Sequence, residues 1–126
     1  MSSLFVARSP DGLTDWTIDA QPVMSPVQDD LQAAWGFEDP RAVWVDELQT
    51  HAVTCTSYGP DGPSVHLSLT PDFEDFEHIG CVMPPEDKNA VLFPRRINGK
   101  YAMYSRPSDN GHTPFGDIFY SESPDL

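Results

Sequence analysis

Two short landmarks recur along the chain in the same order, and this internal repetition restricts the fold more than any other feature. A Ser/Thr-Pro-Asp turn stands at residues 9–11, 70–72 and 123–125, at offsets of 61 and 53 residues. The pattern Glu-Asp-x-x-Ala-Val at 38–43 returns 48 residues later at 86–91. Pro-Asp alone is only a favoured turn pair. Two landmarks that recur in phase indicate a repeated structural unit.

Short runs rich in Val, Tyr, Phe and Trp lie between these turns and predict an all-β fold. The 13 Pro and 8 Gly residues leave little room for long helices. Asn98-Gly99 predicts a two-residue hairpin, because a type I′ turn needs positive φ at both positions. The runs expected to form strands are 4–8, 42–46, 51–57, 65–69, 91–97, 101–105 and 118–121.

A repeat of 48 to 61 residues that holds about four short strands has the size of one β-propeller blade. The repeats are expected at roughly 12–72 and 73–125. A propeller ring typically needs 4–8 blades. The 126 residues are therefore expected to form about two blades of a larger propeller, a fragment that is incomplete at both ends.

The charge balance excludes several classes of partner. The chain has 20 Asp and Glu against 7 Lys and Arg, a formal net charge of -13, which disfavours binding to nucleic acid or an anionic membrane. With no run of 18 apolar residues and no basic leader region, we expect a cytoplasmic protein. Cys55 and Cys81 are expected to be buried free thiols, and no ligand spacing indicates a metal site.

The basic residues are concentrated in one segment. Five of the seven lie between residues 88 and 106, a window of 19 residues with no Asp or Glu. Lys88, Asn89 and Arg106 are predicted to meet at the open end of the hairpin, where they form a candidate anion site. The cations near the turn are expected to make ion pairs on the rim of the protein; they are Arg95, Arg96 and Lys100.

The register of the hairpin decides which of these cations lie together. Counting outward from the Asn-Gly turn, Ile97 faces Lys100. The same count places Val91 opposite Arg106 and brings the open-end group together. A bulge at Pro94 would shift this pairing.

Asp39 occupies the matching place in the preceding repeat. Neighbouring blades present equivalent strand starts to a common face, so Asp39 and the open-end cations are expected to point into one opening. A carboxylate beside a cation cluster suits proton transfer to a leaving group next to an anionic partner. The alternative is an Asp that caps the turn before Pro40, with Arg41 as its ion-pair partner.

Three longer segments carry a resemblance to a known family. They read GFEDPR at 36–41, PPEDKNAVLFP at 84–94 and INGKYAMYSRP at 97–107. In this order they resemble glycoside hydrolase family 130. That family consists of five-bladed propellers and includes the β-1,4-mannooligosaccharide and mannosylglucose phosphorylases.

The resemblance implies inverting phosphorolysis of a β-1,4-mannoside to α-mannose 1-phosphate, with inorganic phosphate as co-substrate and no other cofactor. The general acid of the family falls on Asp39 and is thought to act through the mannose 3-hydroxyl. The phosphate ligands fall on Lys88, Asn89 and Arg106, and Arg41 is a candidate contact to the sugar. The partners implied are a β-mannoside oligosaccharide or disaccharide and phosphate, with a homo-oligomer left open.

One position departs from the family pattern, because Lys88 stands where the family has Arg. Lysine offers a point charge in place of a bidentate fork. Two alternatives to phosphorolysis therefore stay open. One is an inverting β-mannoside hydrolase, which needs a second carboxylate as base, and the other is a non-catalytic sugar-binding piece of a propeller.

Overall fold

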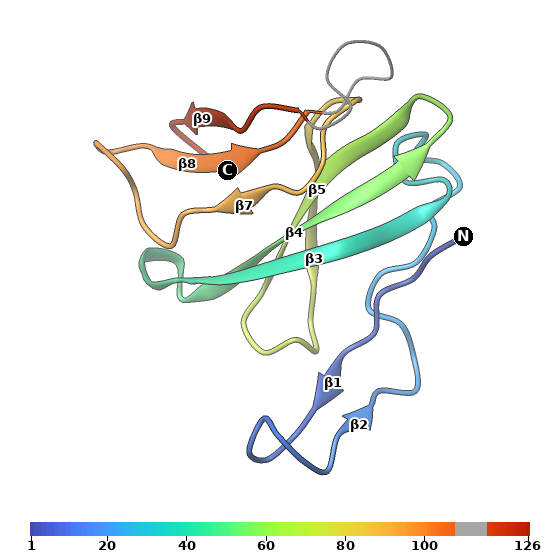
Figure 1. Ribbon diagram of the computed structural model, residues 1–126. Helices are drawn as coiled ribbons and strands as arrows, with labels where there is room; N and C mark the ends of the chain where they lie inside the picture. Colours follow the sequence, from blue (N-terminus) through green and yellow to red (C-terminus); the bar gives the residue numbers. More distant parts are fainter. Residues whose placement is uncertain (108–115) are drawn as a thin grey trace.

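The computed structural model describes residues 1–107 and 116–126, and it contains three antiparallel sheets (Figure 1). The strands form the sheets β1-β2, β3-β4-β5-β6 and β7-β8-β9, each in chain order, so the predicted all-β fold is confirmed. A short 3-10 helix, η1 (Asp46–Leu48), joins β3 to β4, and no helix in the described ranges is long and apolar enough to cross a membrane. The strands are β1 (Ala7–Arg8), β2 (Thr17–Ile18), β3 (Gly36–Val45), β4 (Thr50–Gly59), β5 (Gly62–Thr70), β6 (Glu77–Met83), β7 (Val91–Leu92), β8 (Tyr101–Ser105) and β9 (Phe119–Ser123).

The Ser/Thr-Pro-Asp turn has a similar structure at its three positions. The Asp11 carboxylate accepts the backbone N–H groups two and three residues further on, both at 2.8 Å, and Asp72 accepts the corresponding groups at 2.9 and 3.1 Å. These backbone hydrogen bonds lower the pKa of both carboxyl groups. In the third copy the Ser123 hydroxyl donates to Asp125 at 3.1 Å, as Ser9 donates to Asp11 at 2.9 Å.

The position of this turn relates the three sheets to one another. It connects β1 to β2 and β5 to β6, and it follows β9 directly. The pair β1-β2 therefore corresponds to the last two strands of the four-stranded sheet, and β7-β8-β9 to its first three. The repeat boundaries at 12–72 and 73–125 remain a prediction.

The core lies on both faces of the four-stranded sheet, so that β4 is buried from two sides. On one face Cys55 packs with Met24 of the N-terminal segment. On the other face Ala52 packs with Leu92 of β7 and Tyr101 of β8. Successive side chains of a strand point to opposite faces, and β4 uses both.

The predicted two-residue hairpin is confirmed. Ile97 and Lys100 exchange backbone hydrogen bonds of 2.8 and 3.1 Å. Between them, Asn98 and Gly99 have φ angles of 51° and 82°, both in the left-handed range that a type I′ turn requires.

The predicted pairing of Val91 with Arg106 is wrong. Val91 faces Tyr104 and Leu92 faces Met103, which is two residues away from the register at the turn. The chain bends at residues 94–95, because Pro94 has no N–H with which to continue the ladder. The expected strand at 91–97 is consequently reduced to β7.

Other strands also differ from the prediction: β2 was not expected, and the strand expected at 4–8 is reduced to β1. The strand β6 was not foreseen, because Gly80 interrupts its pattern and its pairing with β5 has two irregularities. The strand β3 begins at Gly36 instead of Ala42 and passes through a bulge that contains Pro40. The strand β3 forms by pairing with the edge of β4, and β6 forms by pairing with the edge of β5.

The two cysteines have different environments. Both are free thiols, as predicted. Cys55 is buried, and desolvation raises the pKa of its thiol to about 12. Cys81 is exposed, contrary to the prediction, because it lies on the edge strand β6.

Replacing Gly36 with alanine is expected to detach the N-terminal segment from β3. Gly36 has a φ of 111°, and a Cβ there would collide with the backbone carbonyl of Ser2. Gly80→Ala is the matched control, because Gly80 has a φ of 114° but a Cβ there meets no atom within 4 Å. Because both positions carry the same backbone strain, we expect the collision to lower the free energy of unfolding of Gly36→Ala by about 1–3 kcal/mol more than that of the control, measured by chemical denaturation. Equal losses would contradict the close approach of Ser2.

Candidate active site

Asp39 lies at a β-bulge in β3, on the exposed surface. The pairing of β3 with β4 shifts between Glu38 and Arg41, and Pro40 removes a ladder donor at the same place. Asp39 has a φ of 49°, in the left-handed region that Asp tolerates better than most residues. Bulges re-aim side chains and occur next to active sites. The local backbone thus turns Asp39 out of the regular pleat.

The carboxylate of Asp39 is available to a ligand, unlike that of its neighbour. Glu38 accepts a hydrogen bond of 2.7 Å from the Ser2 hydroxyl. Within the described residues, the Asp39 carboxylate has no hydrogen-bond or ion-pair partner. Burial, and then the charges of Glu38 and Asp39, raise the pKa of the Tyr58 phenol, which therefore stays protonated beside these carboxylates.

Arg41 forms hydrogen bonds to the backbone of the bulge. Its Nη1 donates to the carbonyl oxygens of Asp39 at 3.0 Å and of Pro40 at 3.1 Å. The alternative in which Arg41 forms an ion pair with the Asp39 carboxylate is therefore wrong, because the guanidinium contacts the backbone of the bulge. A contact between Arg41 and a sugar remains a prediction.

Lys88, Asn89 and Arg106 come together at one end of the third sheet. The Arg106 N–H donates to the Lys88 carbonyl oxygen at 3.0 Å, so the two segments meet although Val91 does not face Arg106. Asn89 has a φ of 56°, and all three side chains are half-buried. The segments of this group are therefore adjacent, and its binding of an anion remains a prediction.

The strand β4 connects the bulge with the open-end group. Its residues Thr54 and Thr56 face the two sides of the bulge in the ladder with β3. The Thr54 hydroxyl donates to the Ala90 carbonyl oxygen at 2.7 Å and lies 3.4 Å from the Arg41 carbonyl oxygen. Thr56 Oγ1 accepts the Asn89 N–H at 3.4 Å. The segments that carry Asp39 and Asn89 therefore contact the same part of β4.

The sequence analysis missed these two threonines. Thr54 is 1% exposed and Thr56 is 3% exposed. Two threonines at alternate positions of a predicted strand were the available signal, because a buried hydroxyl requires a partner. The sequence shows the two threonines but not the backbone groups to which their hydroxyls bond.

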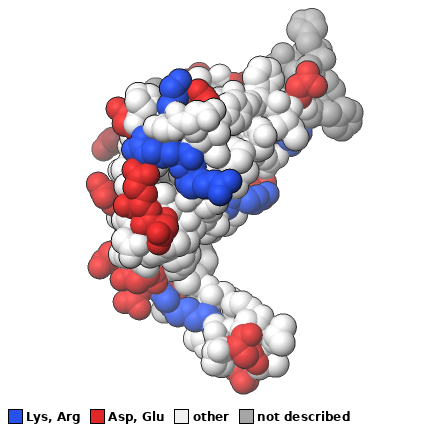
Figure 2. All heavy atoms as spheres, turned by 90° about the vertical axis from the view of Figure 1, so that its left-hand side faces the viewer, with Lys and Arg blue, Asp and Glu red and all other residues white. Residues whose placement is uncertain are grey.

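The cations near the hairpin turn make ion pairs, as predicted, in at least two cases. Arg96 Nε lies 2.9 Å from Glu47 Oε1, and Lys100 Nζ lies 3.0 Å from Glu122 Oε2. Figure 2 faces the side of the molecule where η1 lies and shows Lys and Arg atoms beside Asp and Glu atoms. Exposed pairs of this kind contribute little to stability.

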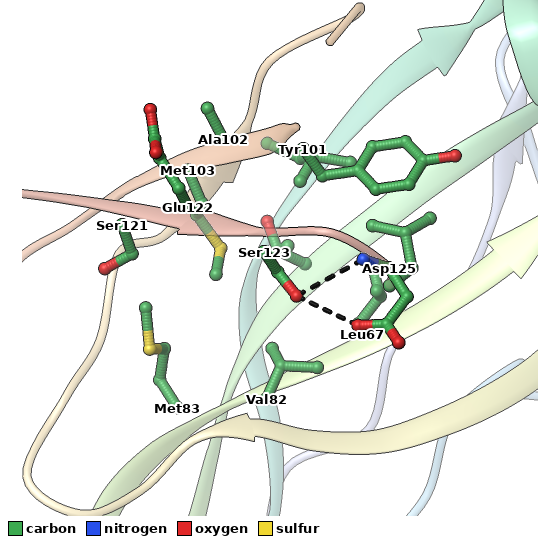
Figure 3. A pocket seen from close by; sticks show the side chains of 13 residues that line it. Leu67, Val82, Met83, Tyr101, Ala102, Met103, Ser121, Glu122, Ser123 and Asp125 are labelled. Atoms are coloured by element: carbon green, nitrogen blue, oxygen red, sulfur yellow. Dashed lines mark hydrogen bonds between the residues drawn. The ribbon is translucent and has the colours of Figure 1, made fainter. Parts of the chain in front are cut away.

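A cavity of about 340 Å³ lies between the second and third sheets (Figure 3). Leu67 and Val82 line it from the second sheet, and Met103 and Ser121 from the third. Neither Asp39 nor the open-end group lines it, so this mainly apolar space is separate from the candidate site. In the part of the chain that the structure describes, no group of three or more His, Cys, Asp or Glu side chains could hold a metal ion.

Comparison with known proteins places these residues in a wider context. The sequence model of the family described as beta-1,4-mannooligosaccharide phosphorylase matches residues 2–126. The chain is 46% identical over 93 residues to a beta-1,4-mannooligosaccharide phosphorylase of Ruminococcus albus, covering 73% of this chain and 27% of the relative. It is 34% identical over 126 residues to a beta-1,2-mannobiose phosphorylase of Listeria innocua, covering 100% of this chain and 34% of the relative.

The fold agrees with that of a solved relative. The structure of the Listeria innocua beta-1,2-mannobiose phosphorylase, in complex with beta-1,2-mannobiose, matches with a TM-score of 0.85 at 33% identity. The match covers 98% of this chain and 33% of that chain. It confirms the predicted propeller architecture. The chain spans about a third of the length of the relatives that it matches.

Proposed function

Because the chain belongs to glycoside hydrolase family 130, we propose that the protein containing it cleaves β-mannosides by inverting phosphorolysis and releases α-mannose 1-phosphate. One observation carries the proposal. The hydroxyls of Thr54 and Thr56 on β4 bond to the segment of Ala90 and Asn89, and the same two residues face the two sides of the Asp39 bulge in β3. This arrangement supports one site shared by the carboxylate and the cationic group.

The reaction needs one carboxylate from the protein. An inverting hydrolase uses one carboxyl group to protonate the leaving oxygen and a second to deprotonate water. Phosphate is already anionic and needs no base. In the proposed step a phosphate oxygen forms a bond to the anomeric carbon while the glycosidic bond to the leaving sugar breaks, and Asp39 supplies the proton for the leaving oxygen. Attack from the face opposite the leaving group converts a β-mannoside to an α-phosphate.

Lys88, Asn89 and Arg106 are proposed to bind the phosphate. Lysine is a competent phosphate ligand although it acts as a point charge, and arginine can bind two oxygens at once. The Asn89 side-chain amide adds neutral N–H donors for a phosphate oxygen. Together these three residues would balance the negative charge of the phosphate without adding a second carboxylate to the site.

Arg41 is proposed to contact the sugar. Its Nη1 donates to two carbonyl oxygens of the bulge, and in the described ranges its remaining N–H groups have no partner. A guanidinium has five donors. The free donors suit the hydroxyl groups of a mannose that is placed over Asp39.

A β-1,4 linkage is the preferred substrate in this proposal. The relative with 46% identity is named for that linkage, as is the family description, whereas the relative with 34% identity is named for β-1,2-mannobiose. A cytoplasmic location fits the same chemistry, because inorganic phosphate is the co-substrate and a charged sugar phosphate would be retained there.

The proposal is tested by the phosphate requirement of the complete protein that carries this sequence. We expect mannose 1-phosphate from β-1,4-mannobiose only when inorganic phosphate is present, and a lower kcat/KM with β-1,2-mannobiose. Product analysis by chromatography or NMR identifies the phosphate ester and its anomeric configuration. Free mannose released equally well without phosphate would indicate hydrolysis instead, and a preference for the β-1,2 disaccharide would reject the linkage.

Asp39→Asn is expected to lower kcat by about 10²–10⁴-fold, the usual contribution of a general acid. Glu38→Gln is the matched control, because its side chain is held by Ser2 and is not proposed to transfer a proton. Initial rates of mannose 1-phosphate release measure both. If Asp39→Asn retained full turnover, the general acid would have to be another residue.

Arg106→Ala is expected to raise the KM for phosphate about 5- to 150-fold, which corresponds to a lost charge-assisted hydrogen bond of about 1–3 kcal/mol. Arg95→Ala is the control, because Arg95 is exposed near the hairpin turn. Steady-state kinetics at varied phosphate give both values. Equal effects of the two substitutions would show that the anion is not bound at the open end.

A further inference from the structure

A buried carboxylate that the proposed reaction does not use lies beneath the open-end group. Asp87 is 8% exposed. One of its oxygens accepts the Lys88 N–H at 2.7 Å, and the other accepts the Ser105 hydroxyl at 2.9 Å. The Asp87 N–H in turn donates to the Pro63 carbonyl oxygen at 3.1 Å, which anchors the residue to β5.

These contacts join the two segments that carry the proposed phosphate ligands. Lys88 and Asn89 follow Asp87 directly, and Arg106 follows Ser105, which is 2% exposed. The side-chain bridge from Asp87 to Ser105 lies beside the backbone bond from the Arg106 N–H to the Lys88 carbonyl oxygen. Two independent links therefore fix the distance between the segments.

The strand ladder alone fixes that distance weakly. β7 has only two residues, and two extra residues enter the hairpin at the bend near Pro94. Lys and Arg side chains have several freely rotating bonds, so their ammonium and guanidinium groups converge only when the backbone beneath them is held. The Asp87 bridge supplies this restraint where the ladder ends.

Asp87 is unsuited to a direct part in the reaction. It occupies the same place in its repeat as Asp39 does in the preceding one, but both of its oxygens are already bonded and it is buried. A general base must reach the proton it removes. Asp87 therefore does not supply the second carboxylate that hydrolysis would require.

We propose that Asp87 is a positioning residue, which through Lys88 N–H and Ser105 sets the spacing of Lys88, Asn89 and Arg106 for one inorganic phosphate. This inference rests on the proposed function. It predicts that loss of Asp87 affects the KM for phosphate and leaves both kcat at saturating phosphate and the KM for the mannoside close to those of the wild type.

The test compares Asp87→Ala, Ser105→Ala and Asp87→Asn in the complete protein. Asp87→Ala removes the carboxylate's bonds to the Lys88 N–H and to Ser105, and it is expected to raise the KM for phosphate about 10- to 100-fold, the scale of a small displacement of binding groups. Ser105→Ala removes only the second of these bonds and is expected to give a smaller rise. Asp87→Asn is the rescue variant, because its amide oxygen can accept the Lys88 N–H and its amide nitrogen can donate to Ser105.

The sign of the change separates positioning from simple electrostatics. Removing a carboxylate near an anion site would by itself tighten phosphate binding and lower the KM. A rise in Asp87→Ala together with recovery in Asp87→Asn supports positioning. A lower KM in both Asp87 variants overturns it, as does an unchanged KM in both Asp87→Ala and Ser105→Ala.

Ser57→Ala is the matched control for general destabilisation. Ser57 is 0% exposed and its hydroxyl lies 2.8 Å from that of Ser64, so this variant also loses a buried hydroxyl contact between strands. We expect it to leave the KM for phosphate unchanged. A rise equal to that of Ser105→Ala would overturn the proposal, because both would then reflect loss of stability.

A second measurement reports on the Asp87 hydrogen bonds independently of catalysis. Amide hydrogen exchange at Lys88 is expected to become faster in Asp87→Ala and to stay slow in Ser57→Ala. Faster exchange with an unchanged KM for phosphate would make Asp87 purely structural and overturn its positioning role. If the wild-type protein itself needs no phosphate, the proposed function fails first and the phosphate-positioning role fails with it. The wild-type assay identifies that outcome before any variant is compared.

Discussion

The Thr54 hydroxyl, buried between two sheets, bonds to the Ala90 carbonyl oxygen, and the arrangement of the candidate site depends on this contact. Thr54 is 1% exposed and Ala90 is 4% exposed, so neither group can turn to water instead. Leaving one of them unpaired would cost about 1–3 kcal/mol. Because β7 is only two residues long, this hydroxyl and that of Thr56 help to dock the third sheet on β4. The bulge in β3 pairs with the same two threonines, so the segments of Asp39 and Asn89 both contact this part of β4.

The repeat places two aspartates in equivalent positions and gives them opposite environments. After Asp39 comes Pro40, which has no N–H to donate, and the chain forms a bulge that leaves the carboxylate exposed. After Asp87 comes Lys88, whose N–H donates to the carboxylate at 2.7 Å while Ser105 satisfies the other oxygen. The residue that follows each aspartate thus helps to separate a candidate acid from a buried anchor.

The parts of the fold that were predicted correctly depend on short-range chemistry. The Asn-Gly hairpin formed because its two residues accept positive φ, and the three Ser/Thr-Pro-Asp turns formed because their side chains bond to nearby residues. The register beyond the hairpin was missed because the effect of Pro94 depends on the partner strand. Lys88 and Arg106 still meet, through a backbone hydrogen bond that the wrong register did not include. The strand β6 was missed because its sequence pattern is weak, and it forms only by pairing with the edge of β5.

Backbone preferences and recurring motifs were thus enough to specify an all-β repeat and its turns, and the resemblance of three longer segments to a known family added the family and the roles of the candidate ligands. They could not reveal Thr54, Thr56 or the role of Asp87. The two threonine contacts join residues 36 and 33 positions apart, and the Asp87 bridge to Ser105 spans 18. A buried polar group bonds to whatever the packed sheets bring within reach. Its partner is therefore a property of the assembled layers and is absent from any local stretch of chain.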